Sequence, residues 1–319
     1  MRQFYPWIGV ARLCGLFGKS RQALYDAEWR ETDELMQEEL IVTMIKDIRK
    51  DLPRLGGAKL YNLLKGKITE HGIKIGRDAF FRLLRQNNLL VKRKRRYVLT
   101  TMSKHHFKRW PNLIENLIAD QPEELWVSDI TYLRTETGFV YLFLITDAYS
   151  RKIMGYHLSQ ELKVKGCIIA LNKALKSRQY PDRELIHHSD RGIQYCCDQY
   201  VSLLLANQLQ ISMTQSGSPY DNAIAERING ILKTELGLDK TFKKYSEAIE
   251  PLTQSIHAYN NLRPHMSCDY LTPQQAHSRQ GKLNTRWKKK KHNGNKQFCN
   301  CSNIAQLYQK NYLFPLRTT

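Results

Sequence analysis

The spacing of apolar residues predicts helices at the start of the chain. Apolar positions over residues 10–17 fall on one helix face, Gly18 interrupts them, and Ser20 is a good N-cap for a second helix starting near Arg21. A helix, a short glycine-containing turn and a basic helix are typical of a helix-turn-helix, although an ordinary helical hairpin has the same pattern. We assign residues 1–36 to such a segment.

A second helical region is expected over residues 37–91. Apolar residues recur at helical spacing over 40–48, and shorter helices are expected over 59–64 and 77–84. Three helices with a basic last one suggest a DNA-binding module of the helix-turn-helix type. Three basic side chains of that last helix would face solvent or phosphate: Arg77, Arg82 and Arg85.

Residues 120–278 change to a pattern of strands and helices. Three apolar, β-branched runs joined by tight turns, 125–132, 139–146 and 153–158, predict an antiparallel meander. The elements expected after it are a helix over 164–175, a strand over 185–188, a helix over 198–206, a strand over 211–213 and a helix opening near Asp221 or Asn222. This order predicts an α+β domain with a mixed five-stranded sheet, preceded by the all-α region.

Charge changes this picture by indicating a partner. The chain has 319 residues, 50 Lys and Arg against 30 Asp and Glu, and a net charge of +20. Such an excess predicts a polyanion, and nucleic acid is the commonest one; a merely basic, solvated surface is the alternative.

The charge is concentrated between the two predicted parts, where residues 92–109 contain no acid. We interpret 92–119 as a basic linker that follows a DNA backbone, with a plain solvated linker as the alternative. The DNA contacts expected there are Lys92, Arg93, Lys94, Arg95 and Arg96. Residues 279–319 are expected to form a basic, flexible tail.

Several classes of protein are excluded. Seven cysteines without a Cys-x-x-Cys argue against a disulfide framework or an ordinary zinc site. There is no run of 18 apolar residues and no secretory signal, so we expect a cytoplasmic protein without a membrane partner.

Three carboxylates carry the candidate chemistry. Asp129 lies in an apolar strand, Asp190 follows a short strand, and Glu226 lies on the predicted helix, with 35 residues between it and Asp190. Carboxylates in this arrangement suggest a two-metal phosphoryl-transfer site, and Mg²⁺ prefers such hard oxygen ligands. Each acid also has an ordinary explanation: an arginine pair for Asp129, a turn or cap for Asp190, and a solvated helix position for Glu226. Three other acids compete for the role: Asp147, Asp198 and Asp221.

The helix that carries Glu226 adds one basic candidate. Lys233 follows Glu226 by seven residues and shares its face, so it could approach DNA beside the metals, although a solvated lysine has the same spacing. Asp221 and Asn222 are interpreted as residues that open this helix and position Glu226. Asp147 lies at a strand end beside Arg151 and is interpreted as structural.

These motifs resemble the DDE transposase and retroviral integrase superfamily, and specifically the catalytic protein of IS3-family insertion sequences. The resemblance covers roughly residues 40–276. Its matching stretches are WVSDITY at 126–132, DAYSRKIMG at 147–155, HSDRGIQY at 188–195, residues 217–226, LKTE at 232–235, YNNLRPH at 259–265 and Thr272-Pro273.

The resemblance implies an RNase H-like catalytic core with Asp129, Asp190 and Glu226 as ligands of two Mg²⁺ ions, for which Mn²⁺ would be a substitute. It implies Lys233 as a DNA-contacting residue, cleavage at the 3′ ends of an element, and strand transfer. It also implies self-association on paired DNA ends and a small upstream helix-turn-helix and leucine-zipper protein as partner or fusion.

Two other functions remain open from the sequence. A non-catalytic, sequence-specific DNA-binding regulator could retain an integrase-like core. A general nuclease of the RNase H type would cleave RNA–DNA hybrids without preference for element ends.

Overall fold

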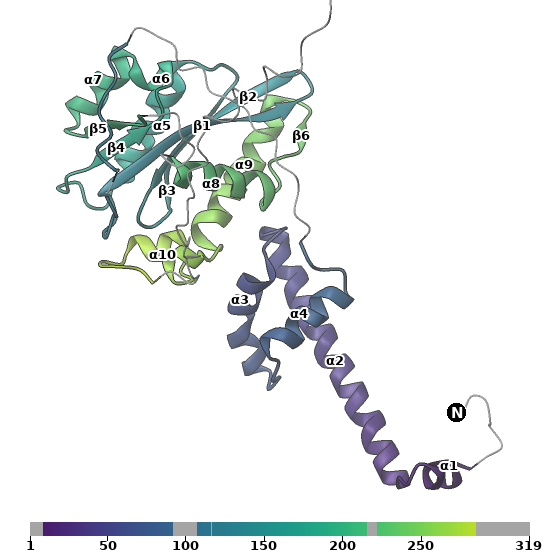
Figure 1. Ribbon diagram of the computed structural model, residues 1–319. Coiled ribbons are helices and arrows are strands. Elements are labelled where there is room, and N and C mark those ends of the chain that lie inside the picture. Colours follow the sequence, from purple (N-terminus) through teal and green to yellow (C-terminus); the bar gives the residue numbers. More distant parts are fainter. Residues whose placement is uncertain (1–8, 92–106, 116, 216–221, 285–319) are drawn as a thin grey trace, which may run out of the picture. The chain divides into compact units, whose positions relative to one another are not determined.

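The N-terminal region is helical in the computed structural model, which describes residues 9–91, 107–115, 117–215 and 222–284. It contains α1 (Val10–Leu16), α2 (Arg21–Asp51), α3 (Gly57–Glu70) and α4 (Arg77–Gln86) (Figure 1). The predicted cap is confirmed, because the Ser20 hydroxyl accepts a hydrogen bond of 3.1 Å from the amide of Ala23. In α3 and α4, Leu60, Leu64 and Phe80 form a buried core with Ile45 of α2.

Helix α2 corrects one prediction. The helix expected from Arg21 and the helix expected over 40–48 are a single element, Arg21–Asp51, which runs through the boundary predicted between residues 36 and 37. The physical reason is that no glycine or proline occurs within those 31 residues.

The second region is built on a mixed sheet of order β3-β2-β1-β4-β5. Its strands are β1 (Leu125–Thr135), β2 (Gly138–Asp147), β3 (Ile153–Ser159), β4 (Ile186–Ser189), β5 (Gln210–Met213) and β6 (Thr241–Phe242). The predicted antiparallel meander is confirmed, since β1 pairs β2 and β2 pairs β3 in that sense, whereas β4 and β5 run parallel to β1. The sixth strand, β6, pairs β1 in parallel and was missed because it is only two residues long.

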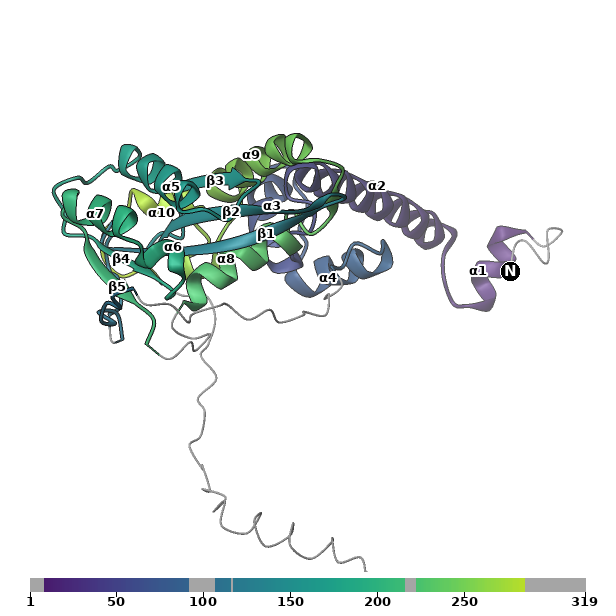
Figure 2. The same ribbon diagram turned by 90° about the horizontal axis from the view of Figure 1, so that it is seen from above.

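Helices cover both faces of the sheet. The remaining helices are α5 (Val164–Lys176), α6 (Ile193–Cys196), α7 (Asp198–Ala206), α8 (Ala223–Thr234), α9 (Tyr245–Asn261), the 3₁₀ helix η1 (Met266–Cys268) and α10 (Pro273–His277). Helices α5 to α7 pack on Trp126 and Phe143, and α8 and α9 pack on Leu142 and Leu144. Figure 2 shows α5 and α8 on opposite sides of β1.

One glycine of the quoted motifs has a packing role. A Cβ atom at Gly155 of β3 would overlap the carbonyl oxygen of Ala170 in α5. Glycine at this position therefore allows α5 to lie directly on β3. Within the described ranges, no helix is long and apolar enough to cross a membrane.

Candidate active site

The parallel pairing of β1 with β4 brings Asp129 and Asp190 to one level of the sheet. Val127 is the register partner of His188, so two residues further along the two strands the chain reaches Asp129 and Asp190. Asp190 lies just beyond the end of β4, and its Oδ1 accepts a hydrogen bond of 3.0 Å from the amide of Gly192. This is the strand end at which open sheets of parallel strands place their ligands.

Helix α8 brings Glu226 to the same strand. Glu226 lies in the first turn of α8 and is exposed. Asn222, one of the two residues expected to open this helix, occupies the N-cap position but makes no capping hydrogen bond; its Nδ2 donates instead to the carbonyl oxygen of Ser128, at 3.0 Å. One turn beyond Glu226, Asn229 Nδ2 donates to Asp129 Oδ2 at 2.6 Å. The helix is thus fastened to β1 on both sides of Glu226.

The electrostatics show that the three carboxylates interact. Burial first, and then the neighbouring charges of Asp190 and Glu226, raise the pKa of Asp129 to about 7. Hydrogen bonds from the Ile130 amide, at 2.9 Å, and from Asn229 act in the opposite direction. Among the described residues, the hydrogen-bond donors to the Asp129 side chain are these two neutral groups, so the arginine pair that sequence left open is not what holds it.

A divalent cation fits the chemistry of these residues but is not held by a finished set of ligands. A partly buried carboxylate close to two others has an unfavourable charge that a hard cation would relieve. Among the residues that the structure describes, however, no three His, Cys, Asp or Glu side chains lie close enough together to hold one ion. The assignment of Asp129, Asp190 and Glu226 as metal ligands therefore stays a prediction.

Lys233 lies beside this group. Its ammonium Nζ is 4.4 Å from the centroid of the Tyr132 ring, a cation–π contact between α8 and β1. Burial lowers the pKa of Lys233, while the charge of Asp129 partly opposes that shift. Lys233 is thus half-buried near Asp129 rather than a freely solvated lysine.

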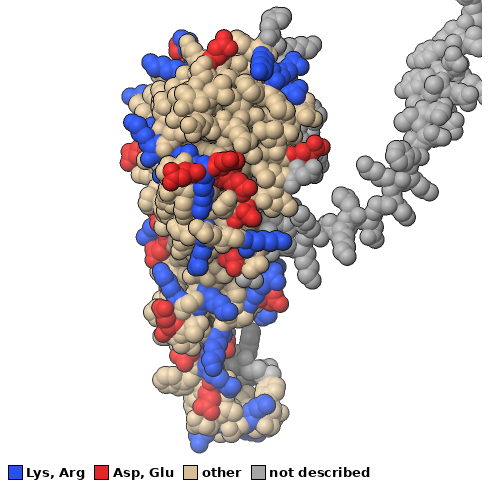
Figure 3. Space-filling model, turned by 90° about the vertical axis from the view of Figure 1, so that its left-hand side faces the viewer, with Lys and Arg blue, Asp and Glu red and all other residues tan. Residues whose placement is uncertain are grey.

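The other predicted DNA contacts fall into two groups, one on α4 and one from Lys92 to Arg96. Arg77, Arg82 and Arg85 are exposed on α4, and the Arg77 guanidinium carbon lies 5.6 Å from the centroid of the Phe81 ring. The predicted contacts from Lys92 to Arg96 lie outside the described residues. Figure 3 shows one face of the molecule, on which basic and acidic side chains are interspersed. The excess charge therefore does not form a single basic patch on that face.

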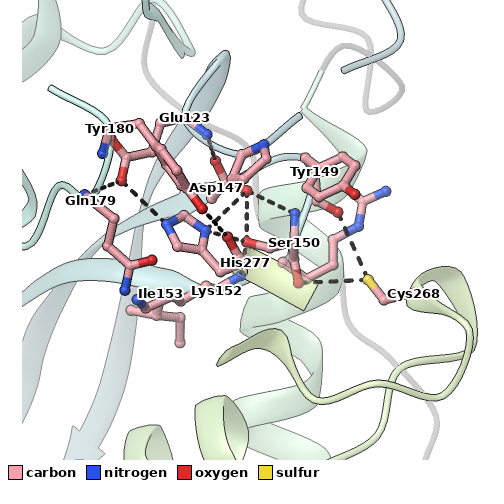
Figure 4. A network of polar contacts seen from close by, with 12 residues as sticks. Glu123, Asp147, Tyr149, Ser150, Lys152, Ile153, Gln179, Tyr180, Cys268 and His277 are labelled. Carbon is pink, nitrogen blue, oxygen red and sulfur yellow. Dashed lines mark hydrogen bonds and ion pairs between the residues drawn. The ribbon is translucent and has the colours of Figure 1, made fainter. Parts of the chain in front are cut away.

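The competing acid Asp147 belongs to a separate buried network (Figure 4). Asp147 Oδ1 accepts hydrogen bonds from the Ser150 amide at 2.7 Å and hydroxyl at 2.6 Å, and Oδ2 accepts from the Glu123 amide at 2.7 Å. His277 of α10 lies 2.9 Å from the Ser150 hydroxyl and 3.3 Å from Glu123 Oε1. These contacts fasten α10 to the sheet, so Asp147 has local partners of its own. Asp198 is exposed in the first turn of α7, and Asp221 lies outside the described residues.

Sequence reasoning missed an ion cluster around Glu235. Glu235 accepts three hydrogen bonds of 2.8–2.9 Å from Arg263, and Lys59 of α3 lies 3.3 Å from its Oε2. The amide of Arg54 also donates to the carbonyl oxygen of Glu235, at 3.1 Å. Glu235 and Arg263 were both present in quoted motifs, but only the fold shows that these motifs meet.

Comparisons with known proteins define the class first. Models of the integrase core domain match residues 119–219 and 207–273, the region that holds the sheet and all three carboxylates. The catalytic core of the HTLV-2 integrase, solved in complex with magnesium, is similar over 49% of this chain and 97% of that chain, with 18% identity and a TM-score of 0.39. The sequence matches thus place an integrase-type core after the helical region.

Curated relatives then define the family. An insertion element IS600 protein of 31 kDa from Shigella sonnei is 34% identical over 82% of this chain and 96% of its own length. The transposase InsF for insertion sequence IS3A from Escherichia coli is 34% identical over 60% of this chain and 67% of its own length. The chain belongs to the insertion-sequence transposases that carry an integrase core domain. The predicted resemblance, fold class and enzyme class are thereby confirmed.

Proposed function

We propose that this transposase cleaves and joins DNA at the ends of its insertion sequence through Asp129, Asp190 and Glu226, with Mg²⁺ held by these carboxylates and Mn²⁺ as a substitute. The observation that carries the proposal is the register of β1 with β4, which brings Asp129 level with Asp190, beside the helix whose first turn holds Glu226. Burial, and then the charges of Asp190 and Glu226, raise the pKa of Asp129 to about 7. Like charges beside a partly buried carboxylate are unfavourable, and a bound cation would offset them.

The chemistry consists of two displacements at phosphorus. In cleavage, water attacks the phosphodiester, the P–O3′ bond breaks, and a 3′-hydroxyl and a 5′-phosphate result. In strand transfer, that 3′-hydroxyl attacks a target phosphodiester and releases a new 3′-hydroxyl, so no covalent protein–DNA intermediate is formed. Bound divalent cations would activate the attacking oxygen and stabilise the leaving oxygen. Lys233 contributes a fixed positive charge beside Asp129, suited to a DNA phosphate.

The helical region would bind the DNA of the element ends. Exposed Arg77, Arg82 and Arg85 on α4 support this role, and the basic residues from Lys92 to Arg96 would follow the backbone between the two regions. We further propose that the protein self-associates on paired ends, with a small upstream helix-turn-helix and leucine-zipper protein as partner or fusion, at the bacterial nucleoid.

An assay on a labelled element end tests the proposal. The wild-type protein should release a 3′-hydroxyl product in Mg²⁺ and in Mn²⁺ and none in a chelator. Asp190→Asn should lower the rate by at least about 10²–10³-fold, because an electrostatic contribution to the transition state is lost. Ordinary cleavage by Asp190→Asn would remove Asp190 from the site.

A second function has one observation in its favour. In the described part of the chain, the acids do not form a set of three close ligands, and Glu226 is exposed. A regulator that binds element ends without cleaving them would fit this arrangement. Specific binding to element ends without nicking of the DNA in any divalent cation would establish the regulator. Cleavage of RNA–DNA hybrids without preference for element ends would instead support a general nuclease.

A further inference from the structure

Two asparagines of α8 fasten the helix to β1, and they do so in different ways. Asn222 and Asn229 are seven residues apart, two helical turns, and both point to the same strand. Asn222 donates to a backbone carbonyl, that of Ser128 at 3.0 Å, whereas Asn229 donates to the carboxylate of Asp129 at 2.6 Å. The first contact fixes only the helix, and the second also fixes a candidate catalytic side chain.

The contacts of Asp129 define the orientation of its carboxylate. Oδ1 accepts from the Ile130 amide at 2.9 Å, and Oδ2 accepts from Asn229. A carboxylate has about four lone-pair sites, so two donors leave about two sites for other ligands. Because each oxygen has one fixed donor, the plane of the carboxylate cannot turn freely.

The chemical type of Asn229 is important because an amide is neutral. A lysine or arginine in its place would orient Asp129 equally well but would cancel the charge that attracts a cation. An amide holds the carboxylate and leaves that charge intact. This is how residues behind metal ligands commonly act: they orient the ligand without replacing the metal.

The other end of the Asn229 side chain is also informative. Asn229 is 7% exposed, and its Oδ1 is buried and accepts no hydrogen bond from any residue that the structure describes. A buried carbonyl oxygen without a donor is costly and calls for a partner. Mg²⁺ keeps several of its waters when bound by proteins, and such waters are donors of the kind that this oxygen requires.

We propose that Asn229 is a positioning residue for the cation site: it orients Asp129 through Nδ2 and offers Oδ1 to the hydration shell of the bound ion. The inference rests on the proposed function, because it assumes that Asp129 holds a divalent cation. Asn222 provides the matched control, because it is the same residue type on the same helix, contacts the same strand and also has a buried Oδ1 without a donor among the described residues, but makes no contact with the carboxylate.

The test measures Mg²⁺ affinity in the absence of DNA, by calorimetry and by the rise of the melting temperature with Mg²⁺ concentration. Asn229→Leu, similar in shape but without a donor, should weaken Mg²⁺ binding about 10–100-fold. Asn229→Gln keeps the amide and should bind more tightly than the Leu variant. Asn222→Ala loosens the helix that carries Glu226 but keeps both donors to Asp129, so it should lower the melting temperature without metal and weaken Mg²⁺ binding clearly less than Asn229→Leu does. Should the Leu variant not fold, Asn229→Ala is measured in the same way.

The outcomes separate the inference from the function on which it rests. Equal losses of affinity in the Asn229 and Asn222 variants would mean that both merely hold the helix, and an unchanged affinity in Asn229→Leu would remove the role altogether; both results overturn the inference. The variant Asp129→Asn shows whether only the role of Asn229 fails or the proposed cation site itself. If it abolishes Mg²⁺ binding while Asn229→Leu does not weaken it, only the inference fails; if wild type and Asp129→Asn both bind no Mg²⁺, the proposed function fails with it.

Discussion

Two groups of acidic side chains in the same domain have opposite surroundings: many hydrogen-bond donors surround the first group, and the second consists of acids that lie beside one another. Glu123 and Asp147 are fully buried and receive hydrogen bonds from backbone amides, Ser150 and Arg178. Around Glu123 these donors, together with His277, overcome burial and lower its pKa to about 2. At Asp129 burial and the neighbouring acids prevail, and its pKa rises to about 7.

The difference shows how a buried acid reveals its role. Where the protein itself supplies enough donors, the negative charge is stable and the group holds the fold together. Where the protein surrounds an acid with other acids and only neutral donors, the charge is left for an external cation. The network of Glu123, Asp147 and His277 is of the first kind, and the group of Asp129, Asp190 and Glu226 is of the second.

The largest expected effect comes from the same substitution made in each group. Asp129→Asn should reduce DNA cleavage at least about 10²–10³-fold, because a charge aimed at the reaction is lost. Its free energy of unfolding without metal should not fall, since the substitution removes a partly buried charge that lies beside two other acids.

Asp147→Asn should do the reverse and lower the free energy of unfolding by roughly 3–5 kcal/mol, because a buried network loses its anion. Urea unfolding and end cleavage, measured on both variants, check the pair. A strongly destabilised Asp129→Asn would contradict the distinction between the groups.

The next effect concerns pH. Because Glu123 has a pKa of about 2 in the folded protein against 4.5 normally, the unfolded chain binds its proton more readily. The stabilisation is therefore nearly complete above about pH 5 and is lost as the pH falls towards 2, on the order of 3 kcal/mol in all. Urea unfolding between pH 2 and pH 7 should show this slope in wild type and a shallower slope in Glu123→Gln. Equal slopes in the two proteins would show that the network does not stabilise the charged form.

A smaller effect is expected at the ion cluster of Glu235. Arg263 is almost fully buried, so Glu235→Gln would leave its charge without an anion and cost about 2 kcal/mol. Lys59 differs, because burial lowers its pKa to about 8 and its charge is already disfavoured. Lys59→Met should therefore change the free energy of unfolding by less than about 1 kcal/mol. Thermal unfolding at pH 7 checks both variants. A larger loss of unfolding free energy in Lys59→Met than in Glu235→Gln would contradict this prediction.

The elements that sequence predicted best are those with a local cause. The meander, α7 and the break at Gly18 follow from periodicity and turn residues within a few positions, so their bounds lie within a few residues of prediction. The register of β1 with β4, which brings Asp129 level with Asp190, pairs residues 61 positions apart, such as Val127 and His188, and was not predicted. The two acids were expected in one site through the resemblance to known motifs. The network around Asp147 was missed for the same reason. Glu123 donates to Asp147 and His277 contacts Ser150, but both lie far from these residues in sequence. Asn229 has no sequence pattern of its own and became visible only from its contact with Asp129.

The smallest effects on stability are expected at exposed charged side chains, which belong to neither of the two groups of acids. Arg82 is exposed on α4, so Arg82→Ala should change the free energy of unfolding by no more than about 0.5 kcal/mol. If Arg82 contacts a phosphate, the variant should weaken binding to all DNA sequences alike and reduce the slope of log affinity against log salt by about 1.

Arg77 is the comparison within the same helix. Its guanidinium packs on the Phe81 ring, so Arg77→Ala should also lower the melting temperature, which Arg82→Ala should not. Fluorescence anisotropy with element-end and unrelated duplexes, from 50 to 200 mM salt, measures both variants. An unchanged salt slope in Arg82→Ala would place the DNA on another face of α4, and a loss confined to element ends would make Arg82 a base-reading residue.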